Sequence, residues 1–244
     1  ILVRSPSVID GYFNDPDGSA KAIVDGWLHT GDAGYFEDDG DLVVLGRVVP
    51  HKRIEHALTV TARLRARHPG LRLRIVGDGW WSDKVREEAV ALGVSDRVDI
   101  LGFVDEQTKH AELAAAWVAL APSIKEGWGL SVVEAASHGT PTVAYTGAGG
   151  LSESIVHGRT GMLVDDLDGL TAAVDHLLTD TTTRESLGAA AIEHAANFTW
   201  ARSVQAWESL LADRAAGLPV EAGTDAVVPD EVRQQRARGV SRRS

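Results

Sequence analysis

The chain has 244 residues, 44% of them hydrophobic and 24% charged, which is ordinary for a globular protein with room for one large or two small domains. Its net charge of −11 disfavours nonspecific binding to nucleic acid, and without cysteine it has neither disulfide bonds nor thiolate metal sites. The longest apolar run, 113–122, is far too short to span a bilayer, and no secretory signal opens the chain. We therefore expect a cytoplasmic protein with no transmembrane segment, and leave open a peripheral contact with the inner face of the membrane.

The acidic charge is concentrated near the start of the chain. Residues 1–46 carry nine acidic and two basic side chains, a net charge of −7, whereas the remaining 198 residues carry a net charge of −4. The chain also begins at Ile1 rather than at methionine. This asymmetry suggests two pieces of different origin, and the start suggests a fragment.

The first piece, about 3–47, resembles the end of the large domain of adenylate-forming acyl-activating ligases. The resemblance rests on Gly11-Tyr12-Phe13-Asn14-Asp15-Pro16 and on Asp25-Gly26-Trp27-Leu28-His29-Thr30-Gly31-Asp32. It implies that Asp32 contacts the ribose of an adenylate, although a simple turn aspartate after Gly31 is the reading we favour. Because the family's phosphate-binding loop and C-terminal lysine domain are absent, we do not expect this piece to activate an acid by itself.

From Leu42 onward, apolar strand patterns alternate with helical ones. We expect them at these positions: strand 42–45, helix 54–67, strand 71–76, helix 82–92, strand 97–101, helix 106–116, strand 117–121, strand 142–145, and helices 171–178 and 184–196. Such alternation predicts an α/β fold with a doubly wound parallel sheet that binds ligands at the carboxyl ends of its strands. Gly46, Gly77, Gly102 and Glu126 all follow strands, so we expect them to converge on one crevice.

The most informative segment is 122–136, where Glu126 and Glu134 stand eight positions apart around a glycine-rich turn. Glycine lets the backbone approach a ligand, and the free N–H groups of the helix that begins at Leu130 attract an anion. That helix is apolar nearly all round, so we expect it to be buried, and a carboxylate on it needs a partner. The plainer alternatives are that Glu126 is a solvated loop residue and that a backbone group satisfies Glu134.

This segment closely resembles the E-x7-E signature of retaining family 4 glycosyltransferases, which have the two-domain GT-B fold. Further landmarks follow in the family's order, over about residues 42–218: Gly46-Arg47 with Lys52, Leu73 to Gly79, Val98 to Val104, Gly149 to Glu153, Gly158 to Gly161 and Phe198-Thr199-Trp200. Strand 42–45 with Gly46-Arg47 fits the ligase pattern equally well, so the two resemblances meet there. The fold that the second one implies is the C-terminal half of GT-B, with a short β-rich extension before it.

The resemblance also implies roles for residues. Arg47 and Lys52 would hold the diphosphate and offset the charge that leaves with it, and Glu126 would bind the donor sugar; these three are the catalytic candidates. Glu134 would bind the ribose. The other donor-binding candidates are Gly77, Gly102, Phe103, Val104, Ser123, Gly127, Trp128, Gly129 and Leu130. The alternatives are that Arg47 and Lys52 are surface charges and that Phe103 belongs to the core.

We thus expect a ligase-like fragment at 1–46, a donor-binding domain at 42–216 and a flexible tail at 217–244. The function implied is transfer of a hexose-type sugar from a nucleotide-diphospho-sugar by a retaining mechanism, with no cofactor and no metal ion. The family's acceptor-binding domain is missing, so we expect donor binding without efficient transfer. Alternatives are a non-catalytic nucleotide-sugar-binding module, a remnant of an acyl ligase, and a composite without an evolved function.

Overall fold

The computed structural model describes residues 2–3, 15–24, 27–29 and 40–215. Tertiary contacts divide the chain into two units, Ile1–Asp38 and Asp39–Ser244. The positions of Asp32 and of the expected tail at 217–244 lie outside the described residues. Each unit is considered by itself.

The first unit contains one short helix and a small antiparallel sheet. Strands β1 (Leu2–Val3), β3 (Trp27–His29) and β2 (Ile23–Val24) pair in that spatial order. Helix α1 spans Pro16–Ala22, and the side chain of Asp15 caps it by accepting a hydrogen bond of 2.8 Å from the N–H of Gly18. An aspartate N-cap followed by proline is a standard helix start, so the local sequence accounts for this helix.

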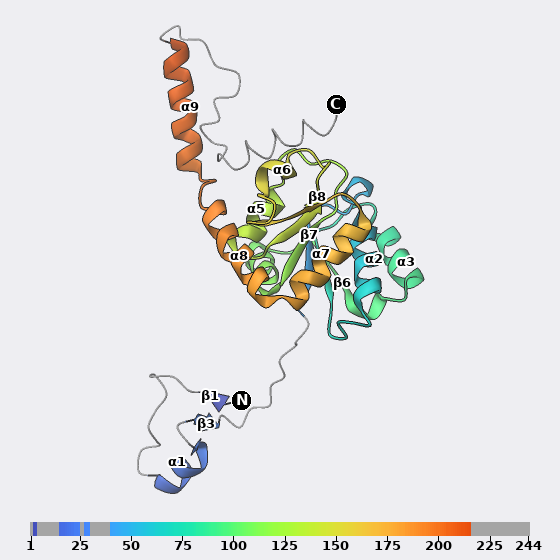
Figure 1. Cartoon of the computed structure of the whole chain (residues 1–244), viewed down its shortest axis with the longest axis vertical. Coiled ribbons are helices and arrows are strands. Elements are labelled where there is room, and N and C mark those ends of the chain that lie inside the picture. Colours follow the sequence, from blue (N-terminus) through green and yellow to red (C-terminus); the bar gives the residue numbers. More distant parts are fainter. Residues whose placement is uncertain (1, 4–14, 25–26, 30–39, 216–244) are drawn as a thin grey trace. The chain divides into compact units, whose positions relative to one another are not determined.

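The second unit is built on a six-stranded parallel sheet. The strands are β4 (Leu42–Leu45), β5 (Leu73–Val76), β6 (Val98–Gly102), β7 (Val118–Ala121), β8 (Thr142–Tyr145) and β9 (Gly161–Val164). Their spatial order is β6-β5-β4-β7-β8-β9, and every pairing is parallel. The predicted α/β fold with a doubly wound parallel sheet is confirmed (Figure 1).

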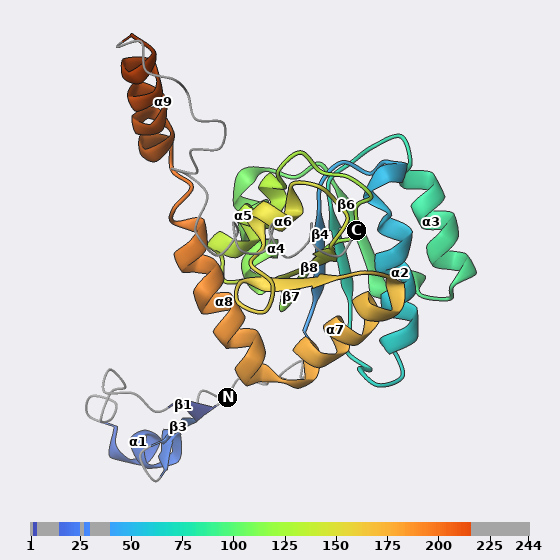
Figure 2. The same cartoon turned by 45° about the horizontal axis from the view of Figure 1, so that its top comes forward.

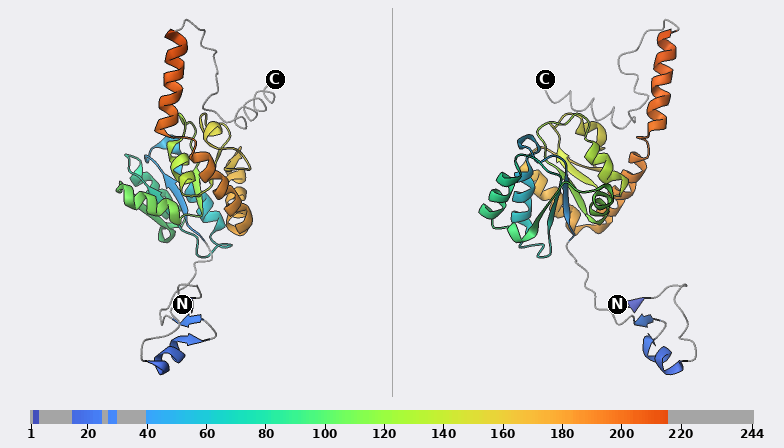
Figure 3. Two further views of the ribbon diagram at one scale, coloured as in Figure 1. Left: turned by 90° about the vertical axis from the view of Figure 1, so that its left-hand side faces the viewer. Right: turned by 180° about the vertical axis from the view of Figure 1, so that it is seen from behind.

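Helices cover both faces of this sheet (Figure 2). Helices α2 (Ile54–Leu64), α3 (Ser82–Ala91) and α7 (Leu167–Thr179) form one layer, in which α2 contacts both of the others. On the other face, α4 (Glu106–Ala115) packs on α5 (Leu130–Ser137), which also contacts α8 (Thr181–Ala195). The remaining helices are the 3-10 turns η1 (Pro50–Lys52) and η2 (Ser95–Arg97), α6 (Leu151–Ser154) and α9 (Trp200–Ala215). Two further views show the strands enclosed by helices (Figure 3).

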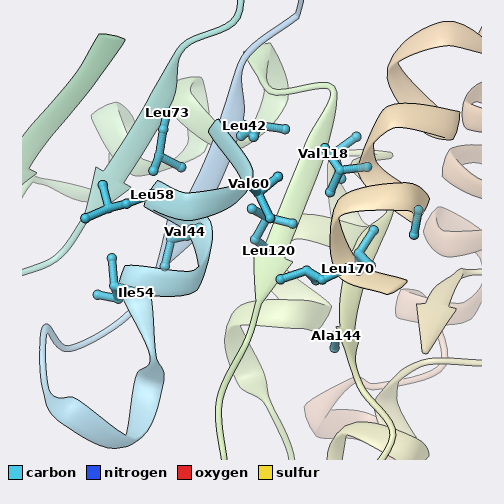
Figure 4. Packing of buried hydrophobic residues seen from close by; sticks show 14 of the residues in the cluster. Leu42, Val44, Ile54, Leu58, Val60, Leu73, Val118, Leu120, Ala144 and Leu170 are labelled. Atoms are coloured by element: carbon cyan, nitrogen blue, oxygen red, sulfur yellow. The ribbon is translucent and has the colours of Figure 1, made fainter. Parts of the chain in front are cut away.

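The sheet is buried on both faces, which explains why its strands are continuous apolar runs. Leu42 and Val44 of β4 belong to the cluster that α2 and α7 complete, with Leu58 and Leu170 among its members (Figure 4). Val43, between them, belongs to a second cluster on the opposite side of the same strand. Alternate residues of one strand thus stabilise two separate layers.

Several element boundaries differ from those expected from the sequence. The helix expected at 54–67 ends at Leu64, and the one expected at 171–178 begins at Leu167, where Asp166 supplies an N-cap through a hydrogen bond of 2.8 Å. Strand β9 (Gly161–Val164) was not predicted from the sequence. The helix that begins at Leu130 is not buried all round, since Leu130 is 70% exposed.

Helix α9 was also not predicted, although one of its faces is apolar. Trp200, Val204, Trp207 and Leu211 recur every three or four residues, and each is more than half exposed. Because side chains three and four positions apart share a helix face, these four form a single exposed stripe. Across the described ranges, no helix combines the length and the apolar composition that a membrane span requires.

Candidate functional site

The candidate site lies where the order of the strands reverses. The chain runs from β4 outward to β5 and β6 on one side, and from β7 outward to β8 and β9 on the other. The loops after β4 and β7 therefore separate, and a crevice opens between them at the carboxyl ends of these strands. The polar residues that line it are Arg47, Lys52, Ser123, Glu126 and Ser131.

Glycines hold the loop after β4 against the loop after β5. Gly77 has a φ of +132°, and a Cβ there would overlap the carbonyl oxygen of Gly46. A Cβ on Gly79 would overlap the carbonyl oxygen of Val48, whose N–H donates a hydrogen bond of 3.0 Å to Asp78. The glycine-rich turn after β5 is thus required for close approach of two backbone segments.

The loop after β7 is held in the same way by the segment that follows β8. The N–H of Glu126 donates to the carbonyl of Ala148 at 2.8 Å, and the carbonyl of Glu126 accepts from the N–H of Gly150 at 3.1 Å. A Cβ on Gly150 would overlap the backbone of Gly127. Gly129, with a φ of +86°, then begins α5 without a side-chain cap. These contacts fix the position of Glu126 before any ligand binds.

Lys52 and Glu126 meet across the crevice, 74 positions apart in sequence. The Lys52 Nζ atom lies 2.5 Å from Glu126 Oε1, which also accepts a hydrogen bond of 2.6 Å from Ser123 Oγ. The two charged side chains are only 16% and 14% exposed. The alternatives of a surface lysine and a solvated loop glutamate are therefore wrong.

The surroundings of Glu126 keep it ionised. Burial by itself would raise its pKa, but the hydrogen bonds from Lys52 and Ser123, with the positive charge of Lys52, outweigh that effect and lower the pKa below 4.5. No described residue contacts its second carboxylate oxygen or accepts from the other two Lys52 protons, which leaves these groups to a ligand. The pair can therefore bind an anion through Lys52 and a hydroxyl group through Glu126 at the same time.

Arg47 and Phe103 are presented to solvent at the same edge of the sheet. Arg47 is exposed, and no described residue accepts a hydrogen bond from its guanidinium. Phe103 is 91% exposed, so the alternative that it belongs to the core is wrong. It follows Gly102, whose carbonyl accepts a hydrogen bond of 2.8 Å from the N–H of Gly77. The loops after β4, β5 and β6 are thus linked in one row.

Glu134, on α5, has a side chain rather than a backbone group as its partner. Its Oε1 atom accepts a hydrogen bond of 2.7 Å from Lys109 Nζ of α4, and its side chain is 37% exposed. Hydrogen bonds from Lys109 to Glu106 and Glu134 outweigh burial and raise the pKa of Lys109, so this lysine stays charged. The plainer alternative for Glu134, satisfaction by the backbone, is wrong.

The other residues predicted to contact the donor differ in how far they are exposed and in what they pack against. Ser123 is 2% exposed and bonded to Glu126, whereas Leu130 is 70% exposed. Trp128 is half-buried and contacts Phe198 edge to face, with ring centroids 4.6 Å apart. Val104 is half-buried and packs on the second core cluster.

Two residues of the site were not predicted from the sequence. Ser131 lines the crevice from the first turn of α5, and Lys109 reaches Glu134 from a different helix. The hydrophobic pattern of α5 gives no sign of a ligand contact at Ser131. Lys109 was missed because its partner is 25 positions away, beyond the reach of local pattern. Among the residues that the structure describes, no three histidine, aspartate or glutamate side chains gather as a metal ion would require.

A comparison with protein-family models matches residues 30–194 to the family described as glycosyl transferases group 1. That match covers both loops of the crevice and the helices that carry Lys109 and Glu134.

Two relatives show how much of a longer protein the chain represents. It is 36% identical over 182 residues to a D-inositol 3-phosphate glycosyltransferase of Corynebacterium diphtheriae, covering 71% of this chain and 42% of that protein. It is 35% identical over 175 residues to an exopolysaccharide phosphotransferase of Streptomyces coelicolor, covering 70% of this chain and 18% of that protein. The chain thus spans less than half the length of these curated relatives.

The fold is also that of solved glycosyltransferase-type structures. Anabaena HepE, crystallised with UDP and glucose, superposes with a TM-score of 0.63 at 25% identity over 74% of this chain and 49% of that one. Sucrose-phosphate synthase from Thermosynechococcus elongatus superposes with a TM-score of 0.64 at 27% identity over 73% and 47% of the two chains. In each case about half of the solved chain is matched.

Proposed function

This chain belongs to the group 1 glycosyl transferases, and we propose that its second unit is the donor-binding half of a retaining family 4 enzyme that uses a nucleotide-diphospho-sugar. The observation that carries the proposal is the contact between Lys52 and Glu126 across the switch point of the sheet. A cation for a diphosphate and a carboxylate for sugar hydroxyls stand next to each other there. In a nucleotide-sugar the diphosphate is bonded directly to the sugar, so a site for it needs these two groups close together.

In this proposal, Arg47 and Lys52 stabilise the departing diphosphate. The bond between the anomeric carbon of the sugar and the diphosphate oxygen breaks, and negative charge accumulates on that oxygen. Two cations placed in advance lower the energy of that charge more in the transition state than in the ground state. The acceptor hydroxyl attacks the same face of the sugar and gives its proton to the departing diphosphate, so the configuration at the anomeric carbon is retained.

Glu126 binds hydroxyl groups of a hexose-type sugar, and Glu134 binds the ribose of the nucleotide. Ionised carboxylates suit these groups because one carboxylate can accept hydrogen bonds from two neighbouring hydroxyls. Relatives and structural neighbours named for glycosyl transfer, and a neighbour solved with UDP and glucose, support this choice of ligand. The acceptor belongs to the part of such an enzyme that this chain does not span.

The test is a calorimetric titration of the full chain with UDP, GDP and ADP, and then with the matching nucleotide-sugars. We expect saturable binding of one diphosphate, tighter for its sugar conjugate. Arg47→Ala should weaken the diphosphate about tenfold or more, because it removes a charge-assisted contact. Arg86→Ala on α3, where the arginine is also exposed, is the matched control and should bind as the wild type does. A folded wild type that binds none of these ligands would contradict the proposal.

A non-catalytic nucleotide-sugar-binding module is the second candidate, and the exposed Arg47 next to a preformed crevice is compatible with it as well. The two candidates differ when an acceptor domain from a relative is supplied. Turnover of the nucleotide-sugar under those conditions supports the transferase, and binding without turnover supports the module.

A further inference from the structure

Lys109 joins two helices of the second unit, α4 and α5. It lies in the first turns of α4, shortly after the loop at Gly102 and Phe103, and its ammonium group reaches α5. Its Nζ atom is 2.8 Å from Glu106 Oε2, 3.0 Å from Glu106 Oε1 and 2.7 Å from Glu134 Oε1. The side chain of Lys109 is 15% exposed, and its ammonium group donates hydrogen bonds to both glutamates.

The contact leaves one side of the Glu134 carboxylate open. Lys109 occupies Oε1, and among the described residues no donor contacts Oε2. The side chain of Glu134 is 37% exposed, compared with 15% for Lys109, so the lysine is the inner partner and the carboxylate the outer one. A glutamate side chain has three rotatable bonds, and a short charge-assisted hydrogen bond to a fixed ammonium restricts them.

We propose that Lys109 is a positioning residue for recognition of the nucleotide ribose. It holds Glu134 in one orientation, so that the free oxygen accepts hydrogen bonds from the vicinal hydroxyls without first losing side-chain entropy. Its positive charge also offsets that of a carboxylate that would otherwise repel the nearby diphosphate. This inference rests on the proposed function, because it assigns Glu134 to the ribose.

Helix α5 places Glu134 suitably for this role. Glu134 lies four positions after Leu130, so both are on one face of the helix that begins at the crevice. The loop before α4 is the one at which Phe103 is exposed, where the base is expected. The start of α4 thus follows the loop that is expected to contact the base, and it also supplies Lys109, which orients the carboxylate of Glu134.

The alternative role for Lys109 is a clip that joins α4 to α5 without acting on a ligand. A clip would affect every nucleotide equally, whereas a positioning residue acts only on ligands that carry the hydroxyl groups. The readout is therefore the ratio of affinities for a nucleoside diphosphate and its 2′-deoxy counterpart, measured by calorimetry on the full chain. The base is the one that binds best in the titrations above.

We expect Lys109→Met to weaken the ribonucleotide about tenfold and to change the deoxynucleotide little, so that the preference for ribose falls by a similar factor. Lys109→Arg keeps a donor and a charge and should restore most of that preference. Lys84→Met on α3, which breaks the 2.9 Å ion pair with Glu87, is the matched control and should leave the ratio unchanged. A thermal melt of each variant confirms that it is folded.

The outcomes separate the inference from the proposed function. Equal weakening of both nucleotides, or no change in either, by Lys109→Met would overturn the positioning role. If the wild type prefers the ribonucleotide and Glu134→Gln removes that preference while Lys109→Met does not, only the inference fails. If the wild type binds no nucleoside diphosphate, or if Glu134→Gln keeps the full preference, the assignment of the ribose site fails and the inference with it.

Discussion

At the scale of single residues, two pairs of opposite charges hold each other in place, and one of these pairs lines the crevice. Lys52 with Glu126 and Lys109 with Glu134 both join a cation and a carboxylate from elements far apart in the chain. A buried charge without a partner is costly, so each partner constrains the other. The pairs differ in burial: the first is 16% and 14% exposed, whereas Glu134 in the second is 37% exposed.

The Lys52–Glu126 pair should make the free energy of unfolding depend on pH, and the substitution Glu126→Gln tests this. The pKa of Glu126 is lowered in the folded chain: burial opposes ionisation, but the bonds from Lys52 and Ser123 outweigh it. The stabilisation is therefore present above pH 4.5 and lost as the pH falls through the lower folded pKa. Glu126→Gln should cost about 1–2 kcal/mol in the free energy of unfolding at pH 7, because a charge-assisted hydrogen bond becomes a neutral one.

Urea unfolding of the wild type and of Glu126→Gln, between pH 7 and pH 3.5, measures this difference. Glu193→Gln, an exposed substitution on α8, is the control and should change the free energy of unfolding little. A difference between wild type and Glu126→Gln that persists undiminished at pH 3.5 would show that the charge of Glu126 does not stabilise the fold.

At the scale of secondary-structure elements, close contacts between loop backbones shape the crevice. The turns after β4 and β5 approach each other at Gly46 and Gly77, and the loops after β7 and β8 do so at Gly127 and Gly150. Parallel strands place these loops side by side at one edge of the sheet. The glycines leave room for the approach, so the spacing of the site depends on these contacts between backbone segments.

Gly77→Ala tests this dependence. Gly77 has a φ of +132°, which an L side chain rarely adopts, and its Cβ would overlap the carbonyl of Gly46. We expect a loss of more than about 2 kcal/mol in the free energy of unfolding, and weaker diphosphate binding in whatever remains folded. Gly147→Ala is the matched control, because a Cβ there meets no atom within 4 Å. Chemical denaturation of both variants measures their free energies of unfolding. Equal values for Gly77→Ala and Gly147→Ala would contradict the close contact between Gly77 and Gly46.

At the scale of the whole molecule, one buried and two half-buried histidines should make the fold sensitive to mild acid. Burial lowers the pKa of His56, His138 and His194 below 6.5; nearby positive charge adds to the effect, while Glu55 opposes it at His56 and Glu134 opposes it at His138. A group with a lowered pKa binds fewer protons in the folded chain than in the unfolded one. Stability should therefore fall as the pH drops below 6.5 and stop falling, for each histidine, below its folded pKa.

His194→Gln isolates one contribution. His194 is 6% exposed, packs edge to face on Phe198, and its buried Nε2 atom has no hydrogen-bond partner among the described residues. Removing its titration should flatten the decline in the free energy of unfolding between pH 6.5 and pH 5. His176→Gln, at an exposed position of α7, is the control and should keep the slope of the wild type. An unchanged slope for His194→Gln would show that another group causes the decline.

The sequence by itself was sufficient for the α/β class, the parallel sheet and most of its elements. Strand β8 was predicted at its observed bounds, and the start of α5 at Leu130 was predicted from a glycine turn followed by an apolar run. These features are local: a strand between helices shows an apolar run, and glycine marks the end of a strand. Strand β9 was missed, and so was α9, although its apolar residues recur at helical spacing.

Only the tertiary structure decided which charges meet. Nothing in the local sequence pattern indicates that Lys52 contacts Glu126, which lies 74 positions later in the chain. The same holds for Lys109 and Glu134, which lie 25 positions apart. The tertiary structure also decided which apolar side chains are buried. Phe103 follows the end of β6 and Leu130 begins α5, so both are exposed at the open edge of the sheet. Periodicity reports which side of an element is apolar, whereas contacts across the sheet depend on strand order, and that order is a property of the whole fold.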